Sequence, residues 1–172
     1  MKTRIYAILA VVVLAVFSRL LPHPWNWTAV GAAALFAGAK FERLSLAVAV
    51  PLIALFLSDL ILGFHGTMVF VYGAFALVAV AAWWGRSHLE GRNVAVASLM
   101  SSLFFFFVTN AGVWMTTNFY PAGAEGLMMS YAAGLPFLGN QIVGDLFYSA
   151  VLFGAWALAE TKIPALAPSS RV

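Results

Sequence analysis

Two aspartates lie inside long apolar segments, where an ionised side chain is costly. Asp59 lies near the C-terminal end of segment 44–62, and Asp145 lies near the N-terminal end of segment 139–159. A carboxyl group within a membrane-spanning helix usually faces the interior of the helical bundle or a water-filled cavity. If the two segments cross a membrane in opposite directions, the two carboxyl groups lie at similar depths. We therefore expect both to line one pocket that opens on the outer side.

A polar and aromatic segment between two apolar runs is the second source of ligand-binding groups. Residues 109–145 contain no Lys or Arg but three Asn, one Gln, one Trp and two Tyr. A few polar groups among aromatic side chains are typical of small-molecule sites. We expect this segment to form the lid and wall of the pocket, with help from two shorter loops. The candidate ligand-binding residues are His23, Trp25, Asn26, Asp59, His65, Tyr72, Asn110, Trp114, Asn118, Tyr120, Asn140, Gln141 and Asp145.

Each of these residues also has a purely structural interpretation. Asp59 can form an ion pair with Arg19 inside the bundle, and Asn110 and Asp145 can hold helices together through hydrogen bonds. The serines that precede the Phe run 104–107 fit simple helix packing. Anchoring at the membrane surface is the alternative for three tryptophans, Trp25, Trp27 and Trp114.

The sequence carries no recognisable enzyme motif. It has no glycine-rich phosphate loop and no G-x-S-x-G nucleophile elbow. The absence of cysteine excludes disulfides and thiolate chemistry. Imidazole suits nickel and cobalt, but His23 and His65 lie far apart in the sequence. We therefore predict no enzyme activity and no intrinsic cofactor.

The composition places the chain in a lipid bilayer. Hydrophobic residues make up 63% of it, charged residues only 9%, and the mean hydropathy is +0.96. A soluble domain has about 25% charged residues. The net charge of +3 does not indicate nucleic acid as a partner, because the basic residues are spread between apolar runs. We predict an all-α membrane protein.

The apolar runs predict six transmembrane helices in a single domain, residues 1–163, followed by a disordered cytoplasmic tail at 164–172. A cleaved signal peptide is the minor alternative for the first run. Run 28–39 is shorter than the roughly 17 residues that a span needs, but its small residues permit close helix packing. We expect 127–135 to form a short re-entrant or interfacial helix between spans 5 and 6. The six predicted spans are 5–21, 28–39, 44–62, 67–85, 94–111 and 139–159.

The basic residues predict the orientation. With six spans and a cytoplasmic N-terminus, only Arg19 lies on the outer side. Lys and Arg concentrate in the cytoplasmic loops of membrane proteins. We therefore predict a multi-pass protein of the bacterial cytoplasmic membrane, with both termini in the cytoplasm. The residues on the cytoplasmic side are Lys2, Arg4, Lys40, Arg43, Arg86, Arg92, Lys162 and Arg171.

Four segments resemble the signature blocks of a family of uncharacterised bacterial membrane proteins. That family is similar to the substrate-binding S-components of energy-coupling factor (ECF) vitamin transporters, and closest to the solitary cobalamin S-component (BtuM) type. The resemblance implies an S-component-like bundle of six helices with a vitamin pocket at its outer end. The segments are SRLLPHPWNWTAVGAAALFAGA (18–39), PLIALFLSDLILGFH (51–65), SSLFFFFVTNAGVW (101–114) and PFLGNQIVGDLFY (136–148).

The resemblance implies uptake of a vitamin, with cobalamin or a related corrinoid favoured. Another vitamin, or a nickel or cobalt ion, is the alternative cargo, and a membrane scaffold or regulatory subunit is the alternative class. Because no cysteine can ligate corrinoid cobalt, His65 or His23 would take that role; Gly63 and Gly66 favour His65. No alanine lies four residues after Ala7, Ala10 or Ala15, so the AxxxA pattern that docks an ECF energising module is missing.

Overall fold

The computed structural model describes residues 2–163 and 166, with side chains from residue 5 onwards. The described residues form helices and no strands, so the prediction of an all-α protein is confirmed. The expected tail at 164–172 lies outside the described residues, except for Leu166. The helices are α1 (Lys2–Leu20), α2 (Val30–Lys40), α3 (Leu44–Leu62), α4 (Met68–Trp84), the short 3-10 helix η1 (Arg86–His88), α5 (Arg92–Thr116) and α6 (Ala124–Lys162).

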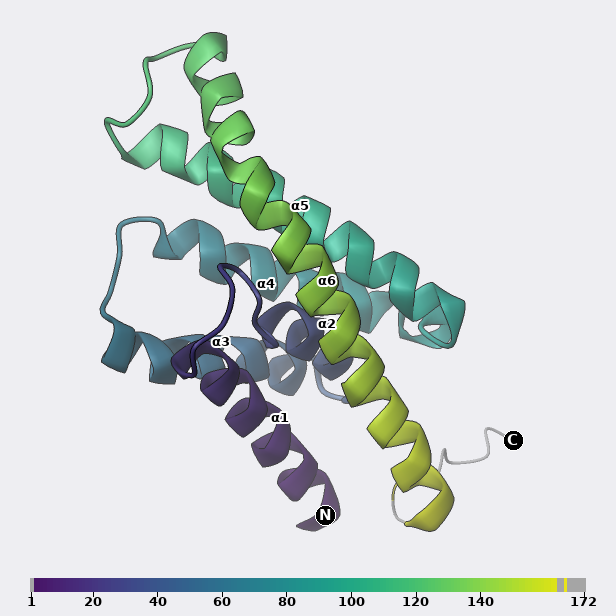
Figure 1. Ribbon diagram of the computed structural model, residues 1–172. Coiled ribbons are helices and arrows are strands. Elements are labelled where there is room, and N and C mark those ends of the chain that lie inside the picture. Colours follow the sequence, from purple (N-terminus) through teal and green to yellow (C-terminus); the bar gives the residue numbers. More distant parts are fainter. Residues whose placement is uncertain (1, 164–165, 167–172) are drawn as a thin grey trace.

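The helices alternate in direction, so the connections gather at two ends of the molecule (Figure 1). Connections 21–29, 63–67 and 117–123 lie at one end, which we call the loop end. The start of α1, the connection between α4 and α5, and the end of α6 lie at the other, the basic end. Lys40, Arg86, Arg92 and Lys162 belong to elements that begin or end there. These four basic residues therefore lie at the end opposite the loop end.

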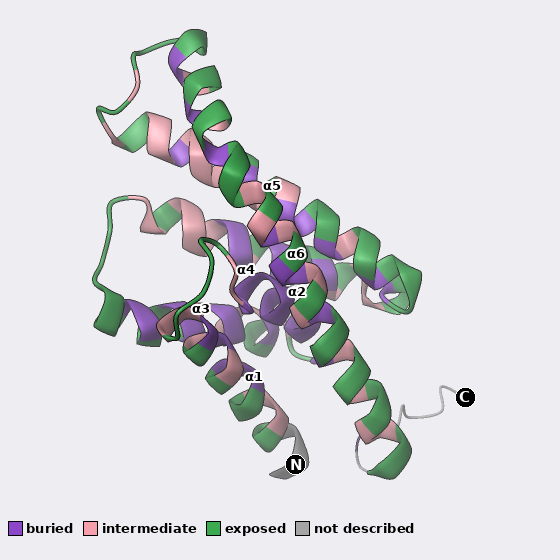
Figure 2. Cartoon of the chain, viewed as in Figure 1, coloured by how far each residue is buried: buried purple, intermediate pink, exposed green. Residues whose placement is uncertain are grey.

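Helix α2 is the centre of the bundle. Every residue from Val30 to Gly38 is buried (Figure 2). Small side chains allow the neighbouring backbones to approach, and a Cβ added to Gly38 would overlap the carbonyl oxygen of Ala79 on α4. The 11 residues of α2 extend about 16 Å, roughly half of the 30 Å hydrocarbon layer.

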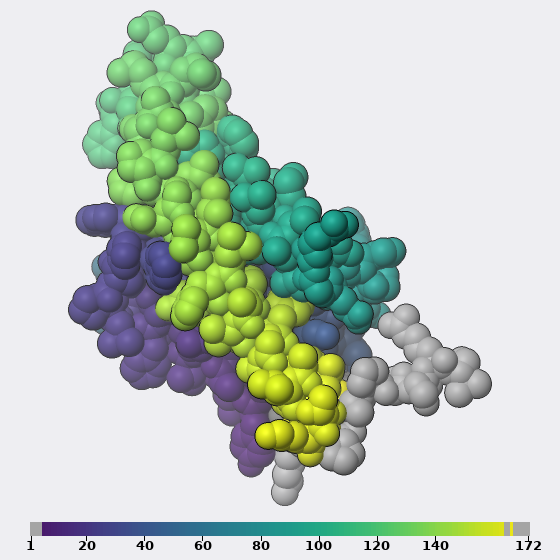
Figure 3. Space-filling model, turned by 45° about the vertical axis from the view of Figure 1, so that its right-hand side comes forward, coloured from purple at the N-terminus to yellow at the C-terminus, as the bar shows by residue number. Residues whose placement is uncertain are grey.

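Helix α6 runs without interruption along one face of the molecule (Figure 3). The prediction of a separate short helix at 127–135 is therefore wrong, because this segment and the expected sixth span share one 39-residue helix. Pro136 removes one backbone donor, but the helix continues because it packs on α5. The Ser130 hydroxyl donates to the Asn110 carbonyl at 2.8 Å, and Gly134 lies against the Asn110 amide.

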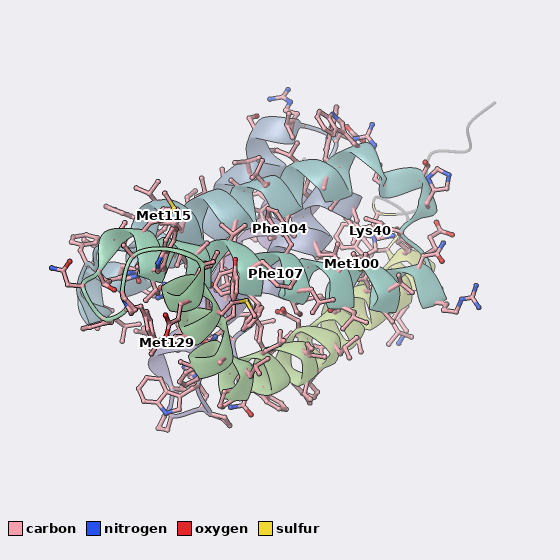
Figure 4. All side chains as sticks on the ribbon, turned by 90° about the horizontal axis from the view of Figure 1, so that it is seen from above. Lys40, Met100, Phe104, Phe107, Met115 and Met129 are labelled. Atoms are coloured by element: carbon pink, nitrogen blue, oxygen red, sulfur yellow. The ribbon has the colours of Figure 1, made fainter. Side chains whose placement is uncertain are left out.

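The outer faces of the helices are apolar. Met100, Phe104 and Phe107 recur at helical spacing along α5 and are 59%, 38% and 52% exposed (Figure 4). Three helices, α3, α5 and α6, are long and apolar enough to cross a membrane. In a soluble protein so many exposed apolar side chains would cause aggregation, whereas in a bilayer they contact lipid. The structure supports a membrane protein.

The close packing around α2 generates a stability prediction. The change Gly38→Ala places a methyl group against the Ala79 carbonyl and the Ala82 side chain, so we expect a loss of about 1–3 kcal/mol. The matched control is Gly73→Ala on α4, where a Cβ meets nothing within 4 Å. Thermal unfolding in detergent should fall for the first variant and stay unchanged or rise for the second. Equal unfolding temperatures for the two variants would contradict the close packing of Gly38 against α4.

Candidate functional site

Two adjoining hollows lie at the loop end of the bundle. Their volumes are about 300 and 340 Å³, together within the range of small-molecule sites. The same five residues line both hollows, so the two are parts of one site: Trp25, Asn26, Val71, Phe105 and Gln141.

Connection 21–29 forms the outer wall of the site. The positive φ of Asn26, 62°, turns the chain, and the Trp27 amide donates to the Pro24 carbonyl at 3.0 Å. This turn brings the Trp25 ring edge-on to Phe137 of α6, with 6.3 Å between ring centroids. Trp25 stays 76% exposed, so an aromatic surface faces the entrance.

Asp59 forms a buried ion pair beside the first hollow. The Arg19 guanidinium on α1 contacts one Asp59 carboxylate oxygen at 2.6 Å, and the Tyr72 hydroxyl on α4 donates to the other at 2.7 Å. Arg19 also donates to the Ser58 hydroxyl at 2.6 Å and to the Leu55 carbonyl at 3.2 Å. Arg19 lines the first hollow, but Asp59 does not. The cluster therefore joins α1, α3 and α4, and only its guanidinium side reaches the site.

Asp145 occupies a different environment on α6. It is 3% exposed and lines the first hollow. The Ser102 hydroxyl on α5 donates to one of its carboxylate oxygens at 2.7 Å. The carboxyl group also lies against Gly31 of α2, where a Cβ would overlap it, and interacts with the Ala32 backbone and the Gln141 side chain. Asp145 thus joins α2, α5 and α6.

The structure brings together eight of the predicted site residues and separates five. The hollows contain His23, Trp25, Asn26, His65, Asn110, Tyr120, Gln141 and Asp145. Of the others, the Trp114 indole donates to the Pro121 carbonyl at 3.0 Å, and Asn118 is exposed. The five residues outside the lining are Asp59, Tyr72, Trp114, Asn118 and Asn140.

The sequence analysis did not identify two kinds of site residue. The apolar walls come from residues such as Val71, Phe75 and Phe105, which look like ordinary helix packing in a sequence. Ser102, which holds Asp145, belongs to the serine pattern that we attributed to packing. Its spacing from Ser98, one helical turn, was the available signal.

The two candidate metal-binding histidines line the same hollow. His65 shares a hydrogen bond of 2.9 Å with the Thr67 hydroxyl, and His23 contacts the Pro24 carbonyl at 2.7 Å. Among the described residues, no group of three or more His, Asp or Glu side chains could hold a free metal ion. A cobalt atom bound within a larger ligand needs only one protein donor, so this role for His65 or His23 stays a prediction.

Fold and site together define an all-helical membrane protein with a polar and aromatic hollow at one end of its bundle. The chain belongs to a family of unknown function, DUF6580, which matches residues 1–166. Comparison with curated proteins and with solved structures finds no match.

The ion pair at Asp59 generates the second prediction. The change Asp59→Asn leaves the partly buried Arg19 guanidinium beside a neutral amide, which we expect to cost about 3 kcal/mol, because the hollow gives the charge some access to water. The change Tyr72→Phe removes one hydrogen bond and should cost about 1 kcal/mol. Thermal unfolding in detergent should rank wild type above Tyr72→Phe and Tyr72→Phe above Asp59→Asn. An Asp59→Asn protein as stable as wild type would contradict a structural role for the pair.

Proposed function

We propose that the protein is an S-component-like binding protein of the bacterial cytoplasmic membrane, which captures a vitamin-type small molecule from the outer side and helps it across. One observation carries this proposal: two hollows at the loop end share five lining residues, and the buried polar side chains of Gln141 and Asp145 belong to their lining. A helix-bundle pocket with aromatic walls and few polar groups is a common form of small-molecule site.

The proposed topology has six crossings, with α1, α2 and α4 completing the set begun by α3, α5 and α6. Helix α2 is too short to cross alone and would depend on the protein around it for shielding from lipid. The basic residues at the basic end favour placement of that end in the cytoplasm. The loop end, with its hollows, then faces the outside, where a nutrient is captured.

A corrinoid remains the favoured ligand in this proposal, with His65 or His23 as the donor to cobalt. A corrinoid is larger than the drug-sized molecules that such hollows usually hold, so connection 21–29 would have to move outward to admit it. A smaller flat vitamin would fit with less movement, and this is the first alternative. Nickel or cobalt as a free ion is the second alternative, supported by the two histidines of the first hollow.

A scaffold or regulatory subunit is the alternative from another class of function. Exposed aromatic residues such as Trp25 and Phe119, which are 76% and 79% exposed, could contact a partner protein. A scaffold, however, gives no role to a buried amide between two hollows, as found at Gln141. The function of a scaffold would survive a change at Gln141, whereas ligand binding would not. A Gln141 variant therefore distinguishes the two proposals.

The binding proposal is tested by gentle purification followed by absorbance spectroscopy and mass spectrometry of co-purifying molecules. We expect a bound small molecule in the wild type, and a corrinoid would give a coloured sample. The change Gln141→Leu removes a polar contact worth about 1–3 kcal/mol, so the amount retained should fall about tenfold. The control Asn118→Ala alters an exposed residue outside the hollows and should retain as much as wild type.

Retention that is equal in Gln141→Leu and wild type would place the ligand elsewhere. A chain that carries no small molecule, even after incubation with cobalamin and other vitamins, would favour the scaffold.

The topology is tested by labelling single cysteines, because the chain has no native thiol. A cysteine at Ala122, in the connection between α5 and α6, should react with a membrane-impermeant reagent added to intact cells. A cysteine at Glu90, in the connection between α4 and α5, should react only after the membrane is opened. Both positions are exposed in the folded protein, so accessibility reports membrane side. The reverse labelling pattern would overturn the proposed orientation.

A further inference from the structure

The two buried aspartates differ in their charge partners. Asp59 and Asp145 are 1% and 3% exposed. Asp59 meets the Arg19 guanidinium at 2.6 Å, whereas the neighbours of Asp145 are a hydroxyl, a backbone amide and a side-chain amide. Within the described part of the chain, no basic side chain lies within ion-pair distance of Asp145. A negative charge there has only dipoles to stabilise it.

The surroundings of Asp145 favour each protonation state through a different interaction. Burial between apolar helices favours the neutral acid, because an isolated charge in a medium of low dielectric constant is costly. The Ser102 hydroxyl and the first turn of α2 favour the carboxylate, because hydroxyl and amide donors point at it. These donors can also bond to an oxygen of the neutral carboxyl group, so the side chain can change its charge without changing its position.

Gln141 supplies a second observation at the same carboxyl group. It precedes Asp145 by one helical turn on α6, lines both hollows and is 4% exposed. Its amide oxygen is buried and accepts no hydrogen bond from the described residues. A buried acceptor without a donor costs about as much as a lost hydrogen bond. The Gln141 amide N–H donates to Asp145 when Asp145 is ionised, and after rotation of the amide its oxygen can accept from a protonated Asp145, so the pair can be hydrogen-bonded in both states.

The hollow gives this carboxyl group a route to water. Asp145 lines the first hollow, together with Arg19, His23 and His65. Arg19 is held by Asp59, and both histidines are exposed at the entrance. The contacts that Asp145 makes with α2 and α5 are to Gly31, Ala32 and Ser102, and none of these side chains titrates near neutral pH.

We propose that Asp145 is a reversible proton-binding site, which takes up and releases a proton around neutral pH in exchange with water in the first hollow. The ligand of this site is the proton itself, which adds to one carboxylate oxygen and is released from it as hydronium. The site does not depend on the identity of the captured molecule. If the proposed capture of a small molecule is also correct, loss of this proton changes the charge at Asp145 in the lining of the first hollow and couples ligand binding to the proton gradient.

Infrared difference spectroscopy of the purified full-length protein in lipid nanodiscs tests the proposal. At neutral pH the wild type should show the carbonyl stretching band of a buried protonated carboxylic acid, which shifts to lower frequency in deuterated water and fades as the pH is raised. The band should be lost in Asp145→Asn. It should persist in Tyr72→Phe, the control that removes a hydrogen bond to Asp59 outside the hollows and leaves the ion pair between Asp59 and Arg19 in place.

Ser102→Ala provides a second variant in case Asp145→Asn does not fold. Removing the hydroxyl donor should move the band to higher frequency, and an unmoved band would assign the acid to another residue and overturn the proposal. Absence of the band in wild type at neutral pH would also overturn it. If the protein with an ionised Asp145 were instead more stable in sodium than in choline, Asp145 would be a sodium site and not a proton site. None of these outcomes depends on finding a captured ligand.

Discussion

The burial of α2 is the constraint on which the rest of the structure depends. An 11-residue helix leaves backbone donors and acceptors unpaired at both ends, and in a bilayer only protein can satisfy them. The Ser18 hydroxyl of α1 accepts from the Ala29 amide at 2.8 Å, and Asp145 of α6 lies at the first turn. The surrounding helices therefore provide both the apolar cover and the polar ends of α2.

This arrangement also explains why the polar groups collect at one end of the molecule. Helix α2 begins close to the loop end, so Asp145, which interacts with its first turn, also lines the first hollow. Arg19 and Asp59 lie nearby and join the helices on the other side. The candidate site is thus not separate from the packing of the bundle, because Arg19 and Asp145 join helices to one another and also line the first hollow.

Several features could be predicted from the sequence because they depend on local composition. The apolar run 44–62 coincides with α3, and run 67–85 differs from α4 by one residue at each end. The length of α6 could not be predicted in this way, because Pro136 and the surrounding glycines are typical of a helix break. Contact with α5 overrides that local preference through Ser130 and Asn110.

The site was accessible to sequence reasoning only in part. The unusual residue types, such as a carboxyl group and amides within apolar runs, identify Gln141 and Asp145 as candidates. Their partners lie on other helices: Ser102 is separated from Asp145 by 43 positions and Arg19 from Ser58 by 39. Composition contains no information about such pairs, and apolar wall residues such as Val71 do not differ in type from residues of the core.

The unbroken course of α6 has a mechanical consequence. Its 39 residues measure about 58 Å along the helix axis, almost twice the thickness of the hydrocarbon layer, and the axis bends part-way along (Figure 4). Because both arms belong to one helix, a displacement near Lys162 would be passed through the bend to Ala124 and the loop end. A loop at Pro136 would have let the two arms move separately.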